Sequence, residues 1–366
     1  MRVIFAGGGT GGHLYPGLSI ARELVRLDPT VEPFFVGAQR GIEREVLPKS
    51  GFPHLLLDLH PLYRPAIWHN WKTILGAFRS WRRITRMVKE DPPALVVGTG
   101  GYAAGLMLAY AVVHRIPMVQ QAGDSHPGIT ARLFARWSRE IYLAFPEAAK
   151  VFGAGPADQH RMIDAGAPIV PPPVPRPGKG AAREQWGFPR EGGRVLLIYG
   201  GSQGSLVINR AVADWVRKGI PDDLYIIWAT GRGTYEEFKS LDSPRVKVKD
   251  YLSPIADAYA ATDLALARAG AMTTAELFAW GIPAILIPLP TAAADHQTLN
   301  ARALETAGAA IHLPQSRLTA EELAKTVTGV LDAPSRMKEL ADKSALRARP
   351  NSAHEIATRI HALLSS

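Results

Sequence analysis

The sequence contains no cysteine among its 366 residues, which excludes disulfides and thiolate-bound metals. It also lacks a His-Glu-x-x-His spacing and an Asp-x-Asp pair, so two common arrangements for holding a catalytic metal ion are missing. We therefore predict that the protein works without a metal ion or another cofactor.

Long apolar runs are absent as well. The longest, Ala103 to Val113, ends at His114 and is far shorter than the roughly 20 residues that cross a bilayer. The first residues enter a strand without the basic segment and cleavage site of a secretory signal, so we expect no such signal. A membrane contact would then be peripheral.

Acidic residues are fewer than basic ones: the chain has 33 Asp and Glu and 42 Lys and Arg, which gives a formal net charge of +9. This excess favours anionic partners such as phosphorylated small molecules, an anionic membrane surface or nucleic acid. The sequence has no nucleic-acid recognition motif, so we predict no nucleic-acid partner. The 47% hydrophobic content indicates a globular chain, and its length favours two domains.

Short apolar runs alternate with stretches of helical periodicity or glycine turns in both halves of the chain. This alternation is typical of α/β proteins with doubly wound parallel sheets. The opening of the second half, RVLLIYGGSQGS, repeats the pattern of the first, RVIFAGGGTGG. The predicted strands are Val3–Ala6, Val31–Val36, His54–Leu59, Leu95–Val97, Pro117–Gln120, Ile141–Ala144, Val195–Tyr199, Leu224–Ala229, Val246–Val248, Leu264–Ala267, Ala284–Ile287 and Ala309–Leu313.

Prolines crowd the stretch between Gly153 and Gly193, where neither a helix nor a central strand can continue. We place an N-terminal domain at 1–165, a proline-rich linker at 166–192 and a C-terminal domain at 193–350. A terminal helix is expected within 351–366, with the N-terminal domain as one candidate packing partner. The two domains are expected to face a cleft at the carboxyl ends of their strands.

Three glycine-rich loops each follow a predicted strand and precede a predicted helix: Gly7–Gly12, Gly98–Tyr102 and Gly200–Gly204. Glycine lets the backbone approach an anion closely, and the next helix points its first N–H groups at that anion. Any one of these loops can also be an ordinary tight turn. Their repeated position favours phosphate binding, and two loops in one domain with one in the other suit two phosphate-bearing substrates.

Polar residues follow later strands of the second half. Glu276, early in a predicted helix, can accept hydrogen bonds from two adjacent ribose hydroxyls, or it can simply stabilise the helix terminus. Asp295, His296, Gln297 and Asn300 suit sugar hydroxyls, and the alternative is a solvated loop with a helix cap.

The motifs GGGTGGH (Gly7–His13), GTGGY (Gly98–Tyr102), GGSQGS (Gly200–Ser205), RAGAMTTAE (Arg268–Glu276) and DHQTLNA (Asp295–Ala301) together resemble the MurG family over nearly the whole chain. The resemblance implies the GT-B fold, with two Rossmann-like domains. It implies an inverting transferase that moves N-acetylglucosamine from UDP-N-acetylglucosamine (UDP-GlcNAc) to lipid I, which is undecaprenyl-pyrophosphoryl-N-acetylmuramoyl-pentapeptide. The product would be lipid II for peptidoglycan, made at the cytoplasmic face of the cell membrane by a peripheral enzyme.

The resemblance also carries the family's site residues onto this chain by position. Glu276 would bind the ribose hydroxyls, while Tyr251 and Leu252 would flank the uracil. All donor-binding positions are Ser202, Gln203, Asn209, Tyr251, Leu252, Arg268, Glu276, Gln297 and Asn300. The positions for the acceptor diphosphate are Thr10, Gly11, Gly12, His13, Gly100, Gly101 and Tyr102.

The chain departs from the family pattern in two places. Gln121, Ala122, Gly123 and Asp124 stand where the family has His-Glu-Gln-Asn, and Arg176 is the candidate for the family's linker arginine. Three alternative functions therefore stay open: a transferase for another lipid, an enzyme like UDP-GlcNAc 2-epimerase, and a catalytically inactive UDP-sugar-binding protein.

Two residues are candidates for the base that takes the proton of the acceptor 4-hydroxyl. His13 is the first, because the ordinary histidine pKa of about 6.5 suits proton transfer near neutral pH; its alternative role is to cap the loop or contact phosphate. Asp124 is the second. We expect helix N–H groups at Gly200–Ser205 and Arg268 to stabilise the leaving diphosphate, so that activity persists in excess chelator.

Aromatic, aliphatic and basic side chains recur at helical spacing between Leu62 and Lys89. An apolar stripe beside cations suits the headgroups of an anionic membrane surface, and the alternative is an ordinary helix whose stripe faces the core. The predicted membrane-contact residues are Trp71, Leu75, Phe78, Trp81 and Arg82.

Overall fold

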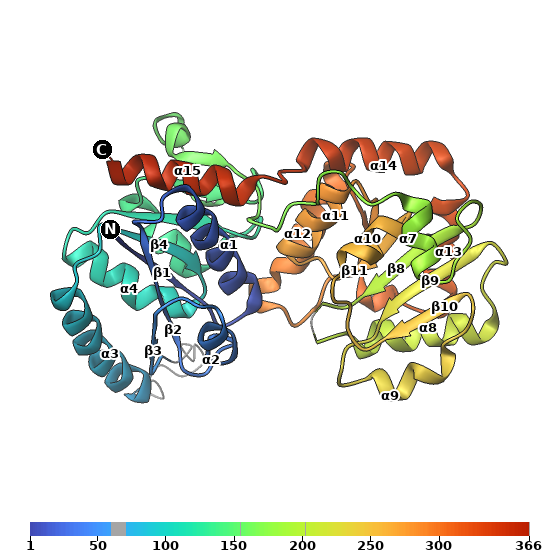
Figure 1. Ribbon diagram of the computed structural model, residues 1–366, viewed down its shortest axis with the longest axis horizontal. Helices are drawn as coiled ribbons and strands as arrows, with labels where there is room; N and C mark the ends of the chain where they lie inside the picture. Colours follow the sequence, from blue (N-terminus) through green and yellow to red (C-terminus); the bar gives the residue numbers. More distant parts are fainter. Residues whose placement is uncertain (60–70, 154, 202, 366) are drawn as a thin grey trace. The chain divides into compact units, whose positions relative to one another are not determined.

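The computed structural model describes residues 1–59, 71–153, 155–201 and 203–365, and it divides into two compact units (Figure 1). The first unit comprises Met1–Val170 with Asn351–Ser366, and the second comprises Pro171–Pro350. Each unit is built around one parallel β-sheet against which helices pack. The predicted fold class, two Rossmann-like α/β domains, is confirmed.

The first sheet has seven strands in the order β3-β2-β1-β4-β5-β6-β7. Its strands are β1 (Arg2–Gly7), β2 (Glu32–Ala38), β3 (His54–Leu57), β4 (Leu95–Gly100), β5 (Met118–Ala122), β6 (Ile141–Leu143) and β7 (Met162–Asp164). The sequence did not predict β7, because only two of its three residues, Met162 and Ile163, are apolar and they form no recognisable apolar run. The other six lie where the apolar runs predicted them.

The helices of the first unit are α1 (Gly11–Leu27), α2 (Glu43–Val46), α3 (Trp71–Glu90), α4 (Tyr102–Val113), α5 (Ile129–Phe134), α6 (Ala148–Val151) and α15 (Ser352–Ser365), with 3₁₀ helices η1 (Leu47–Lys49), η3 (Ala135–Trp137) and η4 (Pro156–Arg161). Successive side chains of β1 point to opposite faces of the sheet. Val3 is buried with Leu18 of α1, and Ile4 is buried with Met107 of α4. Because both faces of β1 are covered, its residues form a continuous apolar run.

The terminal helix α15 packs along α1 in the first unit (Figure 1). Ile356 and Ile360 are fully buried in the core that α1 shares. Arg359 donates to both carboxylate oxygens of Glu140, at 2.9 and 2.7 Å, and Ser352 Oγ donates to the carbonyl oxygen of Gly166. The last residues of the chain therefore complete a domain that its first residues begin.

The second sheet has six strands in the order β10-β9-β8-β11-β12-β13. They are β8 (Arg194–Tyr199), β9 (Leu224–Ala229), β10 (Val246–Lys249), β11 (Leu264–Ala267), β12 (Ala284–Leu286) and β13 (Ile311–His312). The helices are α7 (Lys179–Gln185), α8 (Leu206–Lys218), α9 (Tyr235–Phe238), α10 (Ala256–Ala261), α11 (Ala271–Trp280), α12 (His296–Thr306), α13 (Ala320–Leu331) and α14 (Pro334–Arg347), with 3₁₀ helices η5 (Lys239–Leu241), η6 (Ala293–Asp295) and η7 (Gln315–Arg317).

Helix α7 lies inside the range predicted as a linker. The prolines end before Gly178, and the following residues favour a helix, so α7 begins there and packs on α10 of the second unit. Arg183 of α7 is buried and pairs with Asp263 at 2.6 Å. The range 166–192 therefore includes a helix that belongs to the second unit.

Candidate active site

The two glycine loops of the first unit lie against each other. A register shift between β1 and β4 places Gly7 beside Gly100, and the N–H of Gly8 donates to the carbonyl oxygen of Gly100 at 3.3 Å. Gly101 has a φ of 78°, and a Cβ there would lie 2.1 Å from the carbonyl oxygen of Gly8. Only glycine fits such a backbone contact, so both loops converge on one edge of the sheet.

His13 lies in the first turn of α1, next to these loops. The helix begins at Gly11, and the side chain of Thr10 makes no capping hydrogen bond to it. A Cβ on Gly100 would lie 2.8 Å from Nδ1 of His13, so the imidazole ring covers the second loop. A Cβ on Gly9 would similarly lie 2.8 Å from the ring of Tyr102. The residues predicted for the acceptor diphosphate are thus brought together.

A residue that the sequence analysis missed, Glu43, supports the first loop. Its carboxylate is fully buried, and Oε1 accepts the N–H groups of Gly9 and Ala38 at 2.9 and 3.1 Å. A Cβ on Gly8 or Gly41 would lie 1.9 Å from this carboxylate. Burial first, and the charge of Glu43 second, raise the pKa of the Tyr102 hydroxyl. The glycines around Glu43 were the available sequence signal, because they leave room for a carboxylate.

The altered segment, Gln121–Asp124, comprises the last two residues of β5 and the two that follow, and it lies beside the same loops. A Cβ on Gly123 would be 4.0 Å from the carbonyl oxygen of Gly12, and Asp124 follows it, half-buried. Gln121 is 2% exposed, and among the described residues neither its Oε1 nor its Nε2 has a hydrogen-bond partner. Both candidate bases therefore lie at one edge of the first sheet, His13 in the first turn of α1 and Asp124 in the loop after β5.

In the second unit, the third glycine loop leads into α8. Gly204 has a φ of 75°, and a Cβ there would lie 2.0 Å from the carbonyl oxygen of Thr230. Ser205 caps the helix by accepting the N–H of Ile208, and Gln203 is exposed. Ser202 lies outside the described residues. The glycine loop thus leads directly into the N-terminus of α8, where the first N–H groups of a helix can bind an anion.

Arg268 is buried beside that helix terminus, with 7% of its surface exposed. It donates to Ser205 Oγ at 2.6 Å, to Gln315 Oε1 at 2.8 Å and to two backbone carbonyl groups that follow β12. No carboxylate pairs with it among the residues that the structure describes. Burial lowers the pKa of Arg268 to about 10, so it remains a cation near neutral pH. Its charge acts on the α8 terminus through the Ser205 cap.

Three of the predicted donor-binding amides hold the backbone of the site. Asn209 is 1% exposed, donates to the carbonyl oxygen of Thr230 at 2.7 Å and accepts from Trp228 Nε1 at 3.0 Å. Gln297 Oε1 accepts the N–H of Leu289, and Asn300 donates to the carbonyl oxygen of Ala269. The Asn209 side chain is therefore buried and supports the backbone at Thr230.

The remaining predicted donor residues lie near the ends of β10 and β11. Tyr251 is 45% exposed, with the guanidinium of Arg232 at 5.3 Å from its ring centre, whereas Leu252 is buried. Glu276 is half-buried on α11 and accepts a hydrogen bond from Tyr259 at 2.8 Å. No spacing in the sequence indicated Tyr259, because its role depends on packing between α10 and α11.

Arg176, the candidate for the family's linker arginine, lies at the end of α11. It donates to the carbonyl oxygens of Ala279 and Trp280, at 2.6 and 3.1 Å, and its guanidinium lies 5.8 Å from the Trp280 ring centre. A cation at the C-terminus of a helix stabilises its unpaired carbonyl groups. Its contacts in this unit are accordingly those of a helix cap.

The predicted membrane stripe on α3 divides between core and surface. Trp81 is partly buried and packs on Tyr110, with ring centres 4.9 Å apart. Phe78 is 55% exposed, and the guanidinium of Arg82 lies 4.5 Å from its ring centre. The side chains of Trp71 and Leu75 lie outside the described part of the structure. None of the described helices combines the length and hydropathy needed to span a bilayer.

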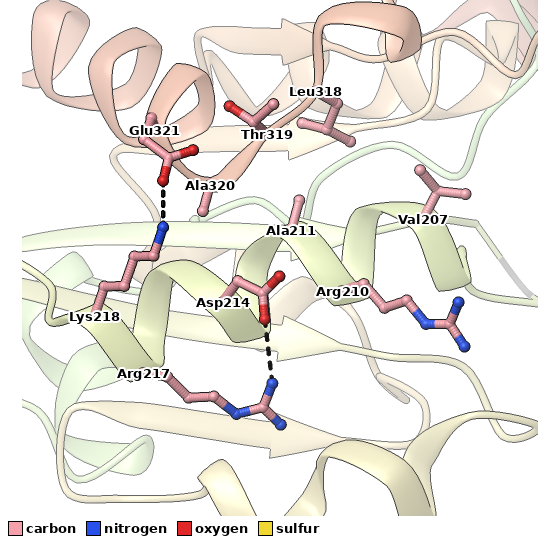
Figure 2. A pocket seen from close by; sticks show the side chains of 10 residues that line it. All are labelled: Val207, Arg210, Ala211, Asp214, Arg217, Lys218, Leu318, Thr319, Ala320 and Glu321. Atoms are coloured by element: carbon pink, nitrogen blue, oxygen red, sulfur yellow. Dashed lines mark hydrogen bonds and ion pairs between the residues drawn. The ribbon is translucent and has the colours of Figure 1, made fainter.

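A pocket of about 600 Å³ lies between α8 and α13 (Figure 2). It is crossed by the ion pair of Lys218 with Glu321, and Asp214 pairs with Arg217 on its wall. None of the residues predicted from the sequence lines it. Over the described ranges, no group of three or more His, Asp or Glu side chains is arranged to hold a metal ion.

Comparisons with known proteins agree with this architecture. Residues 3–143 match the glycosyltransferase family 28 N-terminal domain, and residues 195–356 match the glycosyltransferase family 28 C-terminal domain. A UDP-N-acetylglucosamine--N-acetylmuramyl-(pentapeptide) pyrophosphoryl-undecaprenol N-acetylglucosamine transferase from Desulforamulus reducens is 34% identical, over 100% of this chain and 99% of that protein. The transferase of the same name from Salinibacter ruber is 37% identical, over 99% of this chain and 96% of that protein.

Among solved structures, MurG of Acinetobacter baumannii superposes with a TM-score of 0.77 at 27% identity, covering 99% of both chains. The resemblance that the sequence motifs indicated is confirmed over both units. The chain therefore belongs to glycosyltransferase family 28 and, within it, to the MurG family of GT-B enzymes.

Proposed function

We propose that this protein transfers N-acetylglucosamine from UDP-GlcNAc to the 4-hydroxyl of the muramoyl sugar of lipid I, with inversion, and so forms lipid II. The names of its relatives support this reaction. The structural observation that carries the proposal is the anion seat at the start of α8, where buried Arg268 contacts the Ser205 cap. Glu276 on the neighbouring α11 supplies a carboxylate for the ribose.

The second unit binds the donor in this proposal. N–H groups at the start of α8 and the charge of Arg268 stabilise the diphosphate as it leaves, because both are fixed before the reaction. Tyr251 and Leu252 flank the uracil. This electrostatic stabilisation needs no metal ion, so we expect transfer in excess chelator.

The first unit binds the acceptor. The paired glycine loops and the start of α1 hold its diphosphate, and His13 or Asp124 takes the proton of the attacking hydroxyl. The enzyme works at the cytoplasmic face of the membrane, with Phe78 and Arg82 against anionic lipids.

The test is transfer from radiolabelled UDP-GlcNAc to a short-chain lipid I analogue in excess chelator, with UDP-glucose and UDP-N-acetylgalactosamine as competing donors. Labelled lipid II analogue, with little competition from either sugar nucleotide, is the expected result. Binding of UDP-GlcNAc without transfer to the muramoyl sugar would contradict the proposed acceptor. A strict requirement for a divalent ion would contradict the proposed stabilisation of the leaving group.

A further inference from the structure

Two buried tyrosine hydroxyls form a chain that ends on Glu276. Tyr259 of α10 is 3% exposed, and its Oη donates to Oε2 of Glu276 at 2.8 Å. Tyr199, the last residue of β8, is 6% exposed, and its Oη lies 3.2 Å from Oη of Tyr259. Tyr199 also shares a hydrogen bond with Thr273 in the first turn of α11. The chain thus joins three elements of the second unit.

The direction of these hydrogen bonds follows from the number of protons. A tyrosine hydroxyl donates one hydrogen bond, and a carboxylate only accepts. Because Tyr259 donates its only hydroxyl proton to Glu276, it must accept a hydrogen bond from Tyr199. Tyr199 then accepts a hydrogen bond from Thr273. Every donor therefore points toward Glu276. The chain uses Oε2 alone, and no described residue donates to Oε1 of Glu276.

Burial affects the protonation of all three groups of the chain. Burial raises the pKa of Glu276, and the hydrogen bond from Tyr259 acts in the opposite sense. Burial also raises the pKa of Tyr259 and of Tyr199, so both remain protonated donors near neutral pH. A charge-assisted hydrogen bond stabilises the carboxylate form that a buried site would otherwise disfavour.

We propose that Tyr259, supported by Tyr199, is a positioning residue that orients Glu276 and keeps it ionised, and that the pair thereby sets the preference of the donor site for an intact ribose. This inference rests on the proposed function, in which Glu276 binds the ribose. With Oε2 held by Tyr259, Oε1 and the remaining acceptor capacity of Oε2 face the two hydroxyls of a ribose in one fixed orientation. A carboxylate that rotates, or that takes up a proton, loses one of these two contacts.

The experiment measures the binding of UDP and of 2′-deoxy-UDP to the full-length protein by titration calorimetry across a range of pH. Tyr259→Phe removes one oxygen and keeps the ring, so the fold should persist. We expect about tenfold weaker binding of UDP, the size of one hydrogen bond to a charged group, and a smaller loss for 2′-deoxy-UDP. The pH below which UDP binding weakens should move upward, because the carboxylate has lost its donor.

Tyr225→Phe is the matched control, because Tyr225 lies on β9 and packs on Phe188 instead. It should bind both nucleotides as the unsubstituted protein does. Tyr199→Phe should change the ratio of the affinities for UDP and 2′-deoxy-UDP in the same direction as Tyr259→Phe, but by less. If Tyr259→Phe fails to fold, Tyr199→Phe is the variant that tests the proposal.

Glu276→Gln distinguishes the positioning role of Tyr259 from the ribose-binding role of Glu276. If Glu276→Gln loses the preference for ribose while folded Tyr259→Phe and Tyr199→Phe keep the normal ratio and pH dependence, the positioning role is overturned and the donor assignment stands. If Glu276→Gln binds UDP and 2′-deoxy-UDP as the unsubstituted protein does, the ribose role of Glu276 in the proposed function is wrong, and the inference falls with it.

Discussion

Glu43 and Gly9 are joined by a hydrogen bond between residues 34 positions apart, in which Glu43 Oε1 accepts the backbone N–H at 2.9 Å. The carboxylate has no exposed surface, and the same oxygen accepts the N–H of Ala38. One buried side chain thus fixes the end of β2 to the glycine loop that leads into α1. The position of His13, at the start of that helix, depends on this contact.

Replacing Glu43 should therefore impair binding of the acceptor more than binding of the donor. Glu43→Ala leaves two buried N–H groups without an acceptor and should cost ~2–4 kcal/mol of the free energy of unfolding. Glu43→Gln keeps one oxygen and should fold well. In Glu43→Gln we expect a severalfold higher KM for a lipid I analogue with the KM for UDP-GlcNAc unchanged.

Glu45→Ala is the control for this prediction, because Glu45 is exposed on the same short helix. Its unfolding free energy and both KM values should match those of the unsubstituted enzyme. Equal changes in the two KM values of Glu43→Gln would contradict a role limited to the first loop.

The sequence predicted the positions of strands and loops better than the contacts between side chains. Runs such as Leu224–Ala229 are apolar and bounded by turn residues, so their limits were readable and β9 matches them. Glu43 and Tyr259 act on residues that folding brings close, and no local period or spacing reports such a contact. For Asn209 the sequence motif indicated a position in the donor site. It did not indicate that the side chain is buried.

The ion pair between Glu140 and Arg359 should make the attachment of α15 depend on pH. Burial raises the pKa of Glu140, but the hydrogen bonds and charge of Arg359 outweigh it, so the pKa lies below its ordinary value. A lowered pKa adds stability above the ordinary value near ~4.3, and that stability is lost as the pH falls below it. Glu140→Gln should cost ~1 kcal/mol at pH 7, since Arg359 is partly exposed, and almost nothing near pH 3.

Urea unfolding at the two pH values measures this difference. Glu90→Gln serves as the control, because Glu90 is exposed at the end of α3. Glu90→Gln should leave the unfolding free energy nearly unchanged at both pH values. A loss in Glu140→Gln that is equal at pH 7 and pH 3 would show that the charge of Glu140 is not what holds α15.

Membrane binding is better tested at Phe78 than at Trp81. Trp81 packs on Tyr110, so a charge there would damage the core, whereas Phe78 is exposed beside Arg82. Phe78→Glu should lower binding to anionic vesicles by about tenfold, because it removes an apolar contact and adds repulsion. Added salt should weaken the binding of the unsubstituted protein, and Leu346→Glu, at a leucine that is 72% exposed on α14, should bind normally. Equal binding by all three proteins would reject α3 as the contact surface.

The identity of the base can be decided by comparing His13→Ala with Asp124→Asn. A positioned base contributes ~10²–10⁴-fold, so loss of the true base should lower kcat by at least ~10²-fold while the affinity for UDP-GlcNAc stays constant. The imidazole of His13 lies against Gly100, in a loop that we propose holds the acceptor, and we therefore expect the larger loss in His13→Ala. The acid limb of the pH–rate profile should disappear with the true base, since no group remains whose protonation stops the reaction. If His13→Ala keeps that limb and raises only the KM for the lipid, His13 contacts the acceptor phosphate, and Asp124 becomes the base.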